Sequence, residues 1–209
     1  MLAVSPVLVP LVTAVLTVLL HRQPRVQQAA SIAGAAALLV CALWLIETIT
    51  ADGAVAVAMG SWPLPFAIEL VADRLSVIMV LVTAVLGLGV LVYQCGSQES
   101  MHASDMLHPL VHGLLAAVCG TVLTADLFNL YVWFELMLIT VLGLLVVHQG
   151  LRNLEAAFND FALHLLRTLL FLSAGAMLYG ATGQLNFSAL GEVSQRAELR
   201  DVIPVYIAM

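Results

Sequence analysis

Runs of about twenty apolar residues, each long enough for a helix to cross a bilayer, recur along the chain and limit what it can fold into. Short polar or proline-containing breaks separate them, such as His21 to Gln28 and Ser97 to Asp105. The pattern predicts an all-α, polytopic membrane protein with about six transmembrane helices and the start of a seventh near Ile203. The predicted spans are Leu2–Leu20, Ala29–Ile49, Leu70–Tyr93, Leu107–Leu123, Leu127–Val147 and Leu154–Ala181.

The composition also favours lipid as the surroundings of this chain. Hydrophobic residues make up 62% of it and charged residues only 10%, whereas about a quarter of a soluble domain is charged. All seven basic residues are arginines and the net charge is −6. Because there is no cluster of cations to replace phosphate counterions, the sequence excludes nucleic acid as a partner. We expect a single membrane domain over residues 1–209, in contact with the bilayer.

The cysteines and arginines carry less information. Cys41, Cys95 and Cys119 are scattered without the spacing of a metal or iron–sulfur site, so we expect them to pack as small apolar residues and expect no cofactor. Arg22 and Arg25 follow the first span, and early positive charges favour the cytoplasmic side. This predicts a cytoplasmic first loop and an N-terminus outside the cell.

Glu135 is a carboxyl group inside the fifth predicted span. Asp126 precedes that span and suits the capping position at its start, where a carboxylate accepts from free backbone N–H groups. Counted from Asp126, Glu135 lies roughly 13 Å into the helix, near the middle of a core about 30 Å thick. A carboxyl group there is either neutral or paired. It is a candidate proton carrier, or alternatively a hydrogen-bonded residue that joins helices.

The sixth span holds Asp160, His164 and Arg167, which share one helix face at positions i, i+4 and i+7. An arginine stays protonated in lipid and needs an anion, for which Asp160 and Glu135 are the candidates. One interpretation makes His164 the titrating group and Arg167 a fixed counter-charge. The other is a polar network within one helix that has no role in transport.

His108 and His112 occupy positions i and i+4 of the fourth span. Two histidines at this spacing can share a metal ion, but without a third ligand they form a weak site, and we predict none. His108 lies beside Pro109 at the start of the helix and is expected at the membrane interface. His112, one turn deeper, is a candidate for a hydrated proton path.

Several motifs resemble the antiporter-like membrane subunits shared by Mrp-type sodium/proton antiporters and respiratory complex I, and the D subunit of the Mrp antiporters most closely. The most specific is the run LTADLFNLYVWFE from Leu123 to Glu135, preceded by His108-Pro109-Leu110. Further similarity lies in Trp62–Phe66, Val71–Ser76, Leu154–Phe158 and Leu178–Asn186.

This resemblance implies a multi-pass subunit of the cell (inner) membrane that works with other membrane subunits of a hetero-oligomeric complex. It implies three leading helices in residues 1–95 and an incomplete first antiporter-type repeat in residues 107–209. Glu135 matches the family's proton-path glutamate, whose partner is a lysine on the seventh helix. The chain has no lysine and ends before that helix, so another chain is expected to supply the missing helices.

Three functions remain open from the sequence. The first is an ion-translocating subunit that contributes Glu135, His164 and His112 to a proton or cation path. The second is a structural subunit in which Arg167 replaces the missing lysine and holds Glu135 in a permanent ion pair, because arginine does not give up its proton. The third is an independent small membrane protein that uses His108 and His112 to hold a metal or a quinone. No soluble-type catalytic motif is present.

Overall fold

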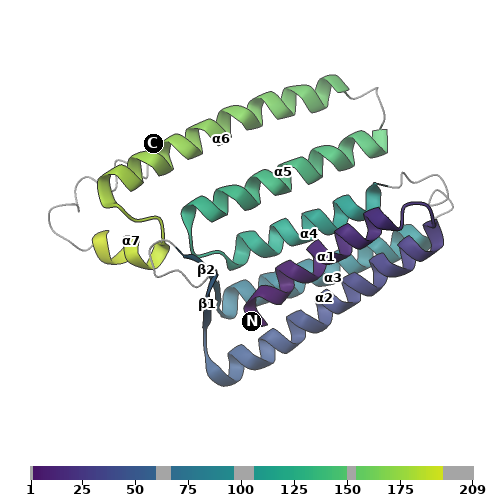
Figure 1. The fold of residues 1–209 in the computed structure, drawn as a ribbon, viewed down its shortest axis with the longest axis horizontal. Coiled ribbons are helices and arrows are strands. Elements are labelled where there is room, and N and C mark those ends of the chain that lie inside the picture. The colour runs from purple at the N-terminus through teal and green to yellow at the C-terminus, as the bar shows by residue number, and fades with distance from the viewer. Residues whose placement is uncertain (1, 60–66, 97–105, 150–153, 195–209) are drawn as a thin grey trace.

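A computed structural model of the protein describes residues 2–59, 67–96, 106–149 and 154–194. Each of the six predicted spans contains one helix, and the largely helical membrane architecture is confirmed (Figure 1). A 3-10 turn, η1 (Leu2–Val4), precedes the first helix, and a short helix, α7 (Phe187–Ser194), follows the sixth. The long helices are α1 (Ser5–Leu19), α2 (Pro24–Asp52), α3 (Arg74–Gly96), α4 (Leu107–Leu123), α5 (Leu127–Gln149) and α6 (Leu154–Thr182).

Within the described residues, α2, α3, α5 and α6 are long and apolar enough to cross a membrane. The other two long helices are apolar but shorter, with 15 residues in α1 and 17 in α4. At a rise of about 1.5 Å per residue, helices of this size cover most of a hydrocarbon core roughly 30 Å thick.

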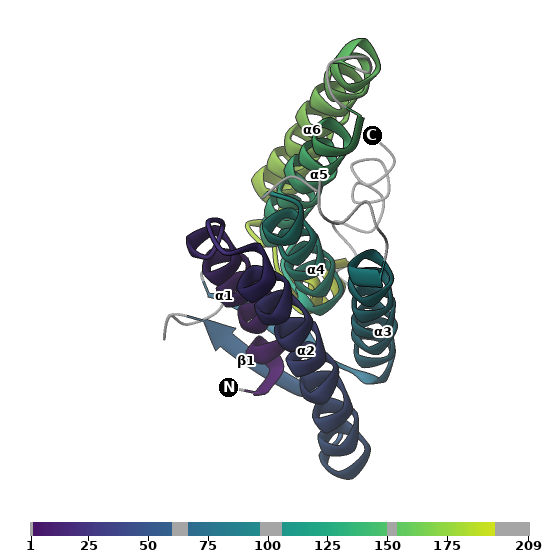
Figure 2. The same ribbon diagram turned by 90° about the vertical axis from the view of Figure 1, so that its right-hand side faces the viewer.

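The helices form two unlike regions, which the end-on view separates (Figure 2). Helices α1, α2, α3 and α4 pack around one another and contain most of the buried core, while α5 and α6 extend from α4 in a row. In the apolar spans, 28% of the residues in α2 and 33% in α3 are buried, against 11% in α5 and 6% in α6. We call these regions the α1–α4 bundle and the α5–α6 pair.

Small residues bring the helices of the bundle close together, as is common between membrane helices. A Cβ atom on Gly34 of α2 would overlap the side chain of Thr13 in α1, and one on Gly87 of α3 would lie 2.6 Å from Leu115 in α4. No such packing is seen at Gly180 of α6, which has no atom within 4 Å of the position a Cβ would take. Close contacts between side chains and glycines therefore fix the helices of the bundle against one another. Much of α6, by contrast, has no neighbours within the described chain.

A β-hairpin between α2 and α3 is the main departure from the predicted organisation. Strand β1 (Val55–Met59) pairs antiparallel with β2 (Ile68–Ala72), from Val55 opposite Ala72 to Met59 opposite Ile68. The prediction that a helix begins at Leu70 was wrong. Leu70 and Ala72 are apolar because this strand buries them in the core, and the helix starts only at Arg74.

Three chain segments meet beside the hairpin, at the end where α5 begins (Figure 1). The backbone N–H of Ala125 donates to the carbonyl of Glu69 at 2.9 Å, and that of Phe187 donates to the carbonyl of Ala125 at 2.9 Å. The side-chain amide of Asn186 donates to the Glu69 carboxylate at 2.6 Å. These bonds fix the starts of α5 and α7 against the hairpin.

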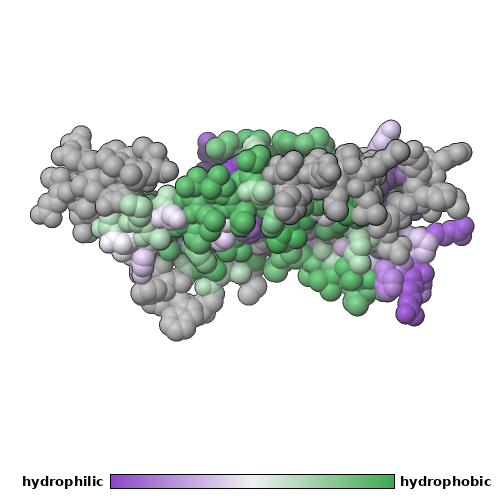
Figure 3. Space-filling view, turned by 90° about the horizontal axis from the view of Figure 1, so that it is seen from above, coloured by the Kyte–Doolittle hydropathy of each residue, from purple (hydrophilic) through white to green (hydrophobic). Residues whose placement is uncertain are grey.

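The surface seen from the α6 side is mainly apolar along the middle, and its largest hydrophilic cluster lies at one end (Figure 3). This distribution suits a molecule whose middle faces lipid. Two sequence predictions fall outside the described residues: the similarity at Trp62–Phe66 and the helix start near Ile203. Asp160 lies in α6, but its side chain is outside the described part.

Candidate functional site

Glu135 lies on α5 in the gap between α5 and α6, and its carboxylate meets two side chains of α6. The Thr168 hydroxyl donates to Glu135 Oε1 at 2.6 Å. His164 Nε2 lies 3.9 Å from the same oxygen, and the two side chains of this pair are 28% exposed for Glu135 and 21% for His164. A carboxylate with an imidazole at this distance forms an ion pair when the imidazole is protonated.

The face of α6 that meets Glu135 differs from the predicted one. His164 and Thr168 occupy positions i and i+4, so they lie one above the other on the same face. Arg167 is exposed, and the described residues contain no ion pair between it and Glu135. Sequence reasoning missed Thr168, although its spacing from His164 is a signal that it shares the histidine's face.

A second buried polar group lies in the bundle, where α4 contacts α2. Ser31 Oγ lies 3.0 Å from His112 Nε2 and 3.1 Å from His108 Nδ1. His112 Nε2 is also 3.1 Å from the carbonyl oxygen of Ser31. The two predicted histidines are thus brought together through one serine, which the sequence did not point to.

The carbonyl contact assigns the hydrogen on the His112 ring. A carbonyl oxygen only accepts, so Nε2 carries the hydrogen in the neutral ring, and Nδ1 has a free lone pair. Nδ1 is buried and has no hydrogen-bond partner in the described part of the chain. His112 therefore presents an unused proton acceptor inside the bundle.

Asp126 holds the capping position that the sequence predicted. Its Oδ1 accepts from the backbone N–H of Asn129 at 2.7 Å. Asn129 in turn donates through Nδ2 to Thr124 Oγ1 at 2.9 Å. The cap fixes where α5 begins and so sets the depth of Glu135, about 13 Å along the helix.

No metal centre is seen within the described ranges, where no three His, Cys, Asp or Glu side chains lie close enough to share an ion. His108 and His112 contact Ser31, with no carboxylate or thiolate beside them in the contacts described above.

Comparison with known proteins shows which proteins the chain is similar to. The family described as "NADH:quinone oxidoreductase/Mrp antiporter, TM" matches residues 124–207. The D subunit of the Na(+)/H(+) antiporter of Bacillus subtilis (strain 168) is 32% identical over 187 residues, which cover 90% of this chain and 38% of that protein. The D subunit of the probable K(+)/H(+) antiporter of Rhizobium meliloti (strain 1021) is 35% identical over 196 residues, covering 90% and 36%.

A solved structure supports the same relationship. A chain in the Mrp complex from Dietzia sp. DQ12-45-1b superposes with a TM-score of 0.77 at 27% identity, covering 88% of this chain and 35% of that one. This chain is similar to the antiporter-like membrane subunits. Like them it is a multi-pass protein of the cell membrane, and it spans little more than a third of the length of these relatives.

The antiporter-like region covers one of the two polar sites. Residues 124–207 include Asp126, Glu135, His164 and Thr168, but not His108 and His112. The Glu135 site therefore lies within the part that defines the family, and the pair of histidines lies before it.

Proposed function

We propose that the protein is a membrane subunit of a multisubunit cation/proton antiporter, or of a related redox-driven pump, and that Glu135 carries protons in its ion path. The observation that carries the proposal is the Glu135 carboxylate, 3.9 Å from the His164 imidazole and 2.6 Å from the Thr168 hydroxyl. A carboxylate and an imidazole form a pair in which both members exchange protons near neutral pH when their surroundings adjust.

The exposure of the pair supports this role. The Glu135 and His164 side chains are 28% and 21% exposed, so neither is sealed from neighbouring groups or water. On its other side α5 packs against α4, where a Cβ atom on Gly120 would overlap the Trp133 ring, but only 6% of the residues in the apolar span of α6 are buried. A partner helix or a column of water can therefore reach Glu135 without disturbing the bundle.

His112 is included as a second proton-binding group. Its Nδ1 atom has a free lone pair inside the bundle, and Ser31 links its ring to His108 near the start of α4. His108, Ser31 and His112 thus form a short chain of groups with exchangeable hydrogens, which runs from the start of α4 into the bundle. The partners that complete the path are other membrane subunits, as in the multisubunit Mrp complex that contains a similar chain.

The alternative role is structural, with Glu135 held permanently by Arg167. The contacts to His164 and Thr168 favour the transport role, because an imidazole can take up and release a proton near neutral pH and a guanidinium cannot. The relatives are described with different cations, sodium in one and potassium in another, so we propose no particular cation.

Proton flux into vesicles that contain the intact complex tests the proposal. We expect Glu135→Gln, which keeps the shape of the side chain and removes its exchangeable proton, to lower flux at least a hundredfold, because lost proton transfer typically costs about 10²–10⁴-fold in rate. His164→Gln should lower it less, because Glu135 stays. Unchanged flux in Glu135→Gln would end the transport role for this residue.

Arg167→Gln separates the two roles. Flux should stay near the wild-type value if Glu135 already exchanges protons with His164. If Arg167 holds Glu135 as a fixed charge, its removal frees the carboxylate and flux increases instead.

A further inference from the structure

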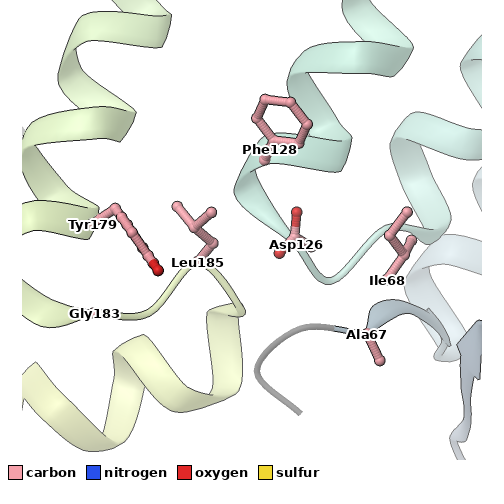
Figure 4. Close-up of a pocket in the computed structure, with 7 residues that line it drawn as sticks. All are labelled: Ala67, Ile68, Asp126, Phe128, Tyr179, Gly183 and Leu185. Carbon is pink, nitrogen blue, oxygen red and sulfur yellow. The ribbon is translucent and has the colours of Figure 1, made fainter. Parts of the chain in front are cut away.

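Two adjoining cavities lie between α5 and α6 at the end where α5 begins. The first, of about 200 Å³, contains Asp126 and is closed on one side by Gly183 in the turn after α6 (Figure 4). The second, of about 230 Å³, continues along the helices past Tyr131, Phe171 and Gly175. Phe128, Tyr179 and Leu185 line both cavities, so the two lie side by side, and we treat them as one site.

The two halves of the site differ in chemistry. The first half contains the Asp126 carboxylate, with the Tyr179 side chain on the opposite wall (Figure 4). The second half is lined almost wholly by apolar atoms. Together they reach the volume of about 300–1,000 Å³ that small-molecule sites occupy. A site with one polar and one apolar half matches an amphiphile.

We propose that this site binds a membrane phospholipid with a primary ammonium headgroup, one acyl chain lying along the second cavity and the ammonium facing Asp126. Phe128 is 52% exposed and Tyr179 48% exposed, so the site is open to the outside of the described chain. It begins at the first residues of α5 and the last of α6, where the headgroup layer is expected.

The charge of the site selects the headgroup. Asp126 is buried, with only 7% of its surface exposed. One carboxylate oxygen accepts from the Asn129 N–H, which leaves most of the acceptor positions of a carboxylate unused. Among the described residues that line the two cavities there is no arginine or histidine. An ammonium is therefore favoured here and a headgroup with a net negative charge is repelled.

The inner end of the site lies close to the proposed proton carrier. Tyr131 is one helical turn before Glu135 on α5, and Phe171 is one turn after Thr168 on α6. The Tyr131 and Phe171 rings are stacked, with centroids 6.3 Å apart. A bound acyl chain would cover this ring pair on the side toward lipid.

Native mass spectrometry of the full-length protein in detergent tests the site, with dioleoyl phosphatidylethanolamine and dioleoyl phosphatidylglycerol added at equal concentrations. We expect phosphatidylethanolamine to bind about fivefold more than phosphatidylglycerol, as one ammonium–carboxylate pair at a membrane edge allows. Asp126→Asn should reduce that ratio to about one, because asparagine still caps α5 but carries no charge.

Two glycine variants test the apolar half. Gly175→Leu places a side chain in the second cavity, while Gly180→Leu adds the same side chain on the same helix in open space. Binding of both lipids should fall at least fivefold in Gly175→Leu and stay unchanged in Gly180→Leu. If Gly175→Leu gives no folded protein, Phe171→Ala, which widens the second cavity and removes the ring beside Tyr131, replaces it with the same expectation of weaker binding.

Three results would overturn the proposal. One is equal binding of the two lipids, or preference for phosphatidylglycerol, in the wild type. Another is an unchanged lipid ratio in Asp126→Asn. The third is displacement of phosphatidylethanolamine by an equal concentration of a short-chain quinone, which would assign the site to a neutral amphiphile.

Discussion

The α1–α4 bundle and the α5–α6 pair hold buried polar groups of different kinds. In the bundle, Ser31 and His112 are shielded completely by closely packed helices. In the pair, Glu135 and His164 remain 28% and 21% exposed. The polar group of the bundle is fully enclosed by helices, whereas the polar group of the pair is partly exposed.

This difference assigns separate tasks to the two regions. Burial in an apolar core penalises the charged form of a titratable group, so the partly exposed Glu135 is the main proton carrier of the proposal, and the buried His112 depends on its contacts with Ser31 and, through it, His108. The bundle provides a rigid base, because the side chains of Thr13 and Leu115 fill the positions that longer residues would take at Gly34 and Gly87.

The largest effect is expected where the bundle is tightest. Gly34→Leu forces a side chain into the volume held by Thr13, and overpacking of this kind costs about 1–3 kcal/mol or more of unfolding free energy. Gly180→Leu in the pair should cost less than about 0.5 kcal/mol because its surroundings are open. Thermal unfolding in detergent measures both, and equal shifts in melting temperature would mean that the two regions are packed alike.

A smaller effect is expected at the polar contact inside the bundle. Ser31→Ala removes the hydroxyl that contacts His108 and His112, but His112 Nε2 keeps the Ser31 carbonyl, so only the half-buried His108 Nδ1 loses its partner, at a cost of about 1 kcal/mol. The matched control is Ser173→Ala in α6, an exposed serine whose hydroxyl donates to the carbonyl of Leu169 at 2.7 Å. If Ser173→Ala destabilises the protein as much as Ser31→Ala, the histidine contact does not stabilise the bundle.

The sequence predicted the features that depend on neighbours along the chain. The bounds of α4, Leu107–Leu123, were predicted to the residue, because apolar residues fill the helix and polar residues flank it. The capping role of Asp126 was also predicted from local sequence, and its Oδ1 accepts from the Asn129 N–H in the structure. Local hydropathy was misleading at Leu70–Ala72, where strand and helix residues are equally apolar.

Contacts between distant residues were beyond the sequence. Ser31 and His112 are 81 positions apart, and Thr168 and Glu135 are 33 apart. Nothing in the spacing along one helix shows which residue of another helix will face it, because that depends on how the two helices are rotated and on their relative depth. For this reason Glu135 and His164 were found as candidates, while Thr168 and Ser31 were not.

The smallest effect concerns the caps at the starts of α3 in the bundle and α5 in the pair. Asp73 Oδ1 accepts from the Ser76 N–H at 2.7 Å, and Ser76 Oγ accepts from the Asp73 N–H at 2.8 Å, which is a reciprocal capping box. Asp126 makes only the bond from its side chain: its Oδ1 accepts from the Asn129 backbone N–H. Replacing either aspartate by alanine should cost about 1 kcal/mol of unfolding free energy. Chemical unfolding in detergent measures this cost, and no loss of stability in either variant would contradict a capping role.

The Asp73 cap also depends on pH. Hydrogen bonds from Ser76 lower the pKa of the Asp73 carboxyl below its usual value of 3.8, so its charged form is favoured in the folded protein. The charge of Asp73 therefore stabilises the fold at pH values above this usual pKa. That stabilisation is lost as the pH falls through the lower pKa of the folded protein. Asp73→Asn keeps an acceptor that does not titrate. The stability difference between wild type and Asp73→Asn should shrink between about pH 5 and pH 3, and a constant difference would show that the charge of Asp73 adds nothing to the cap.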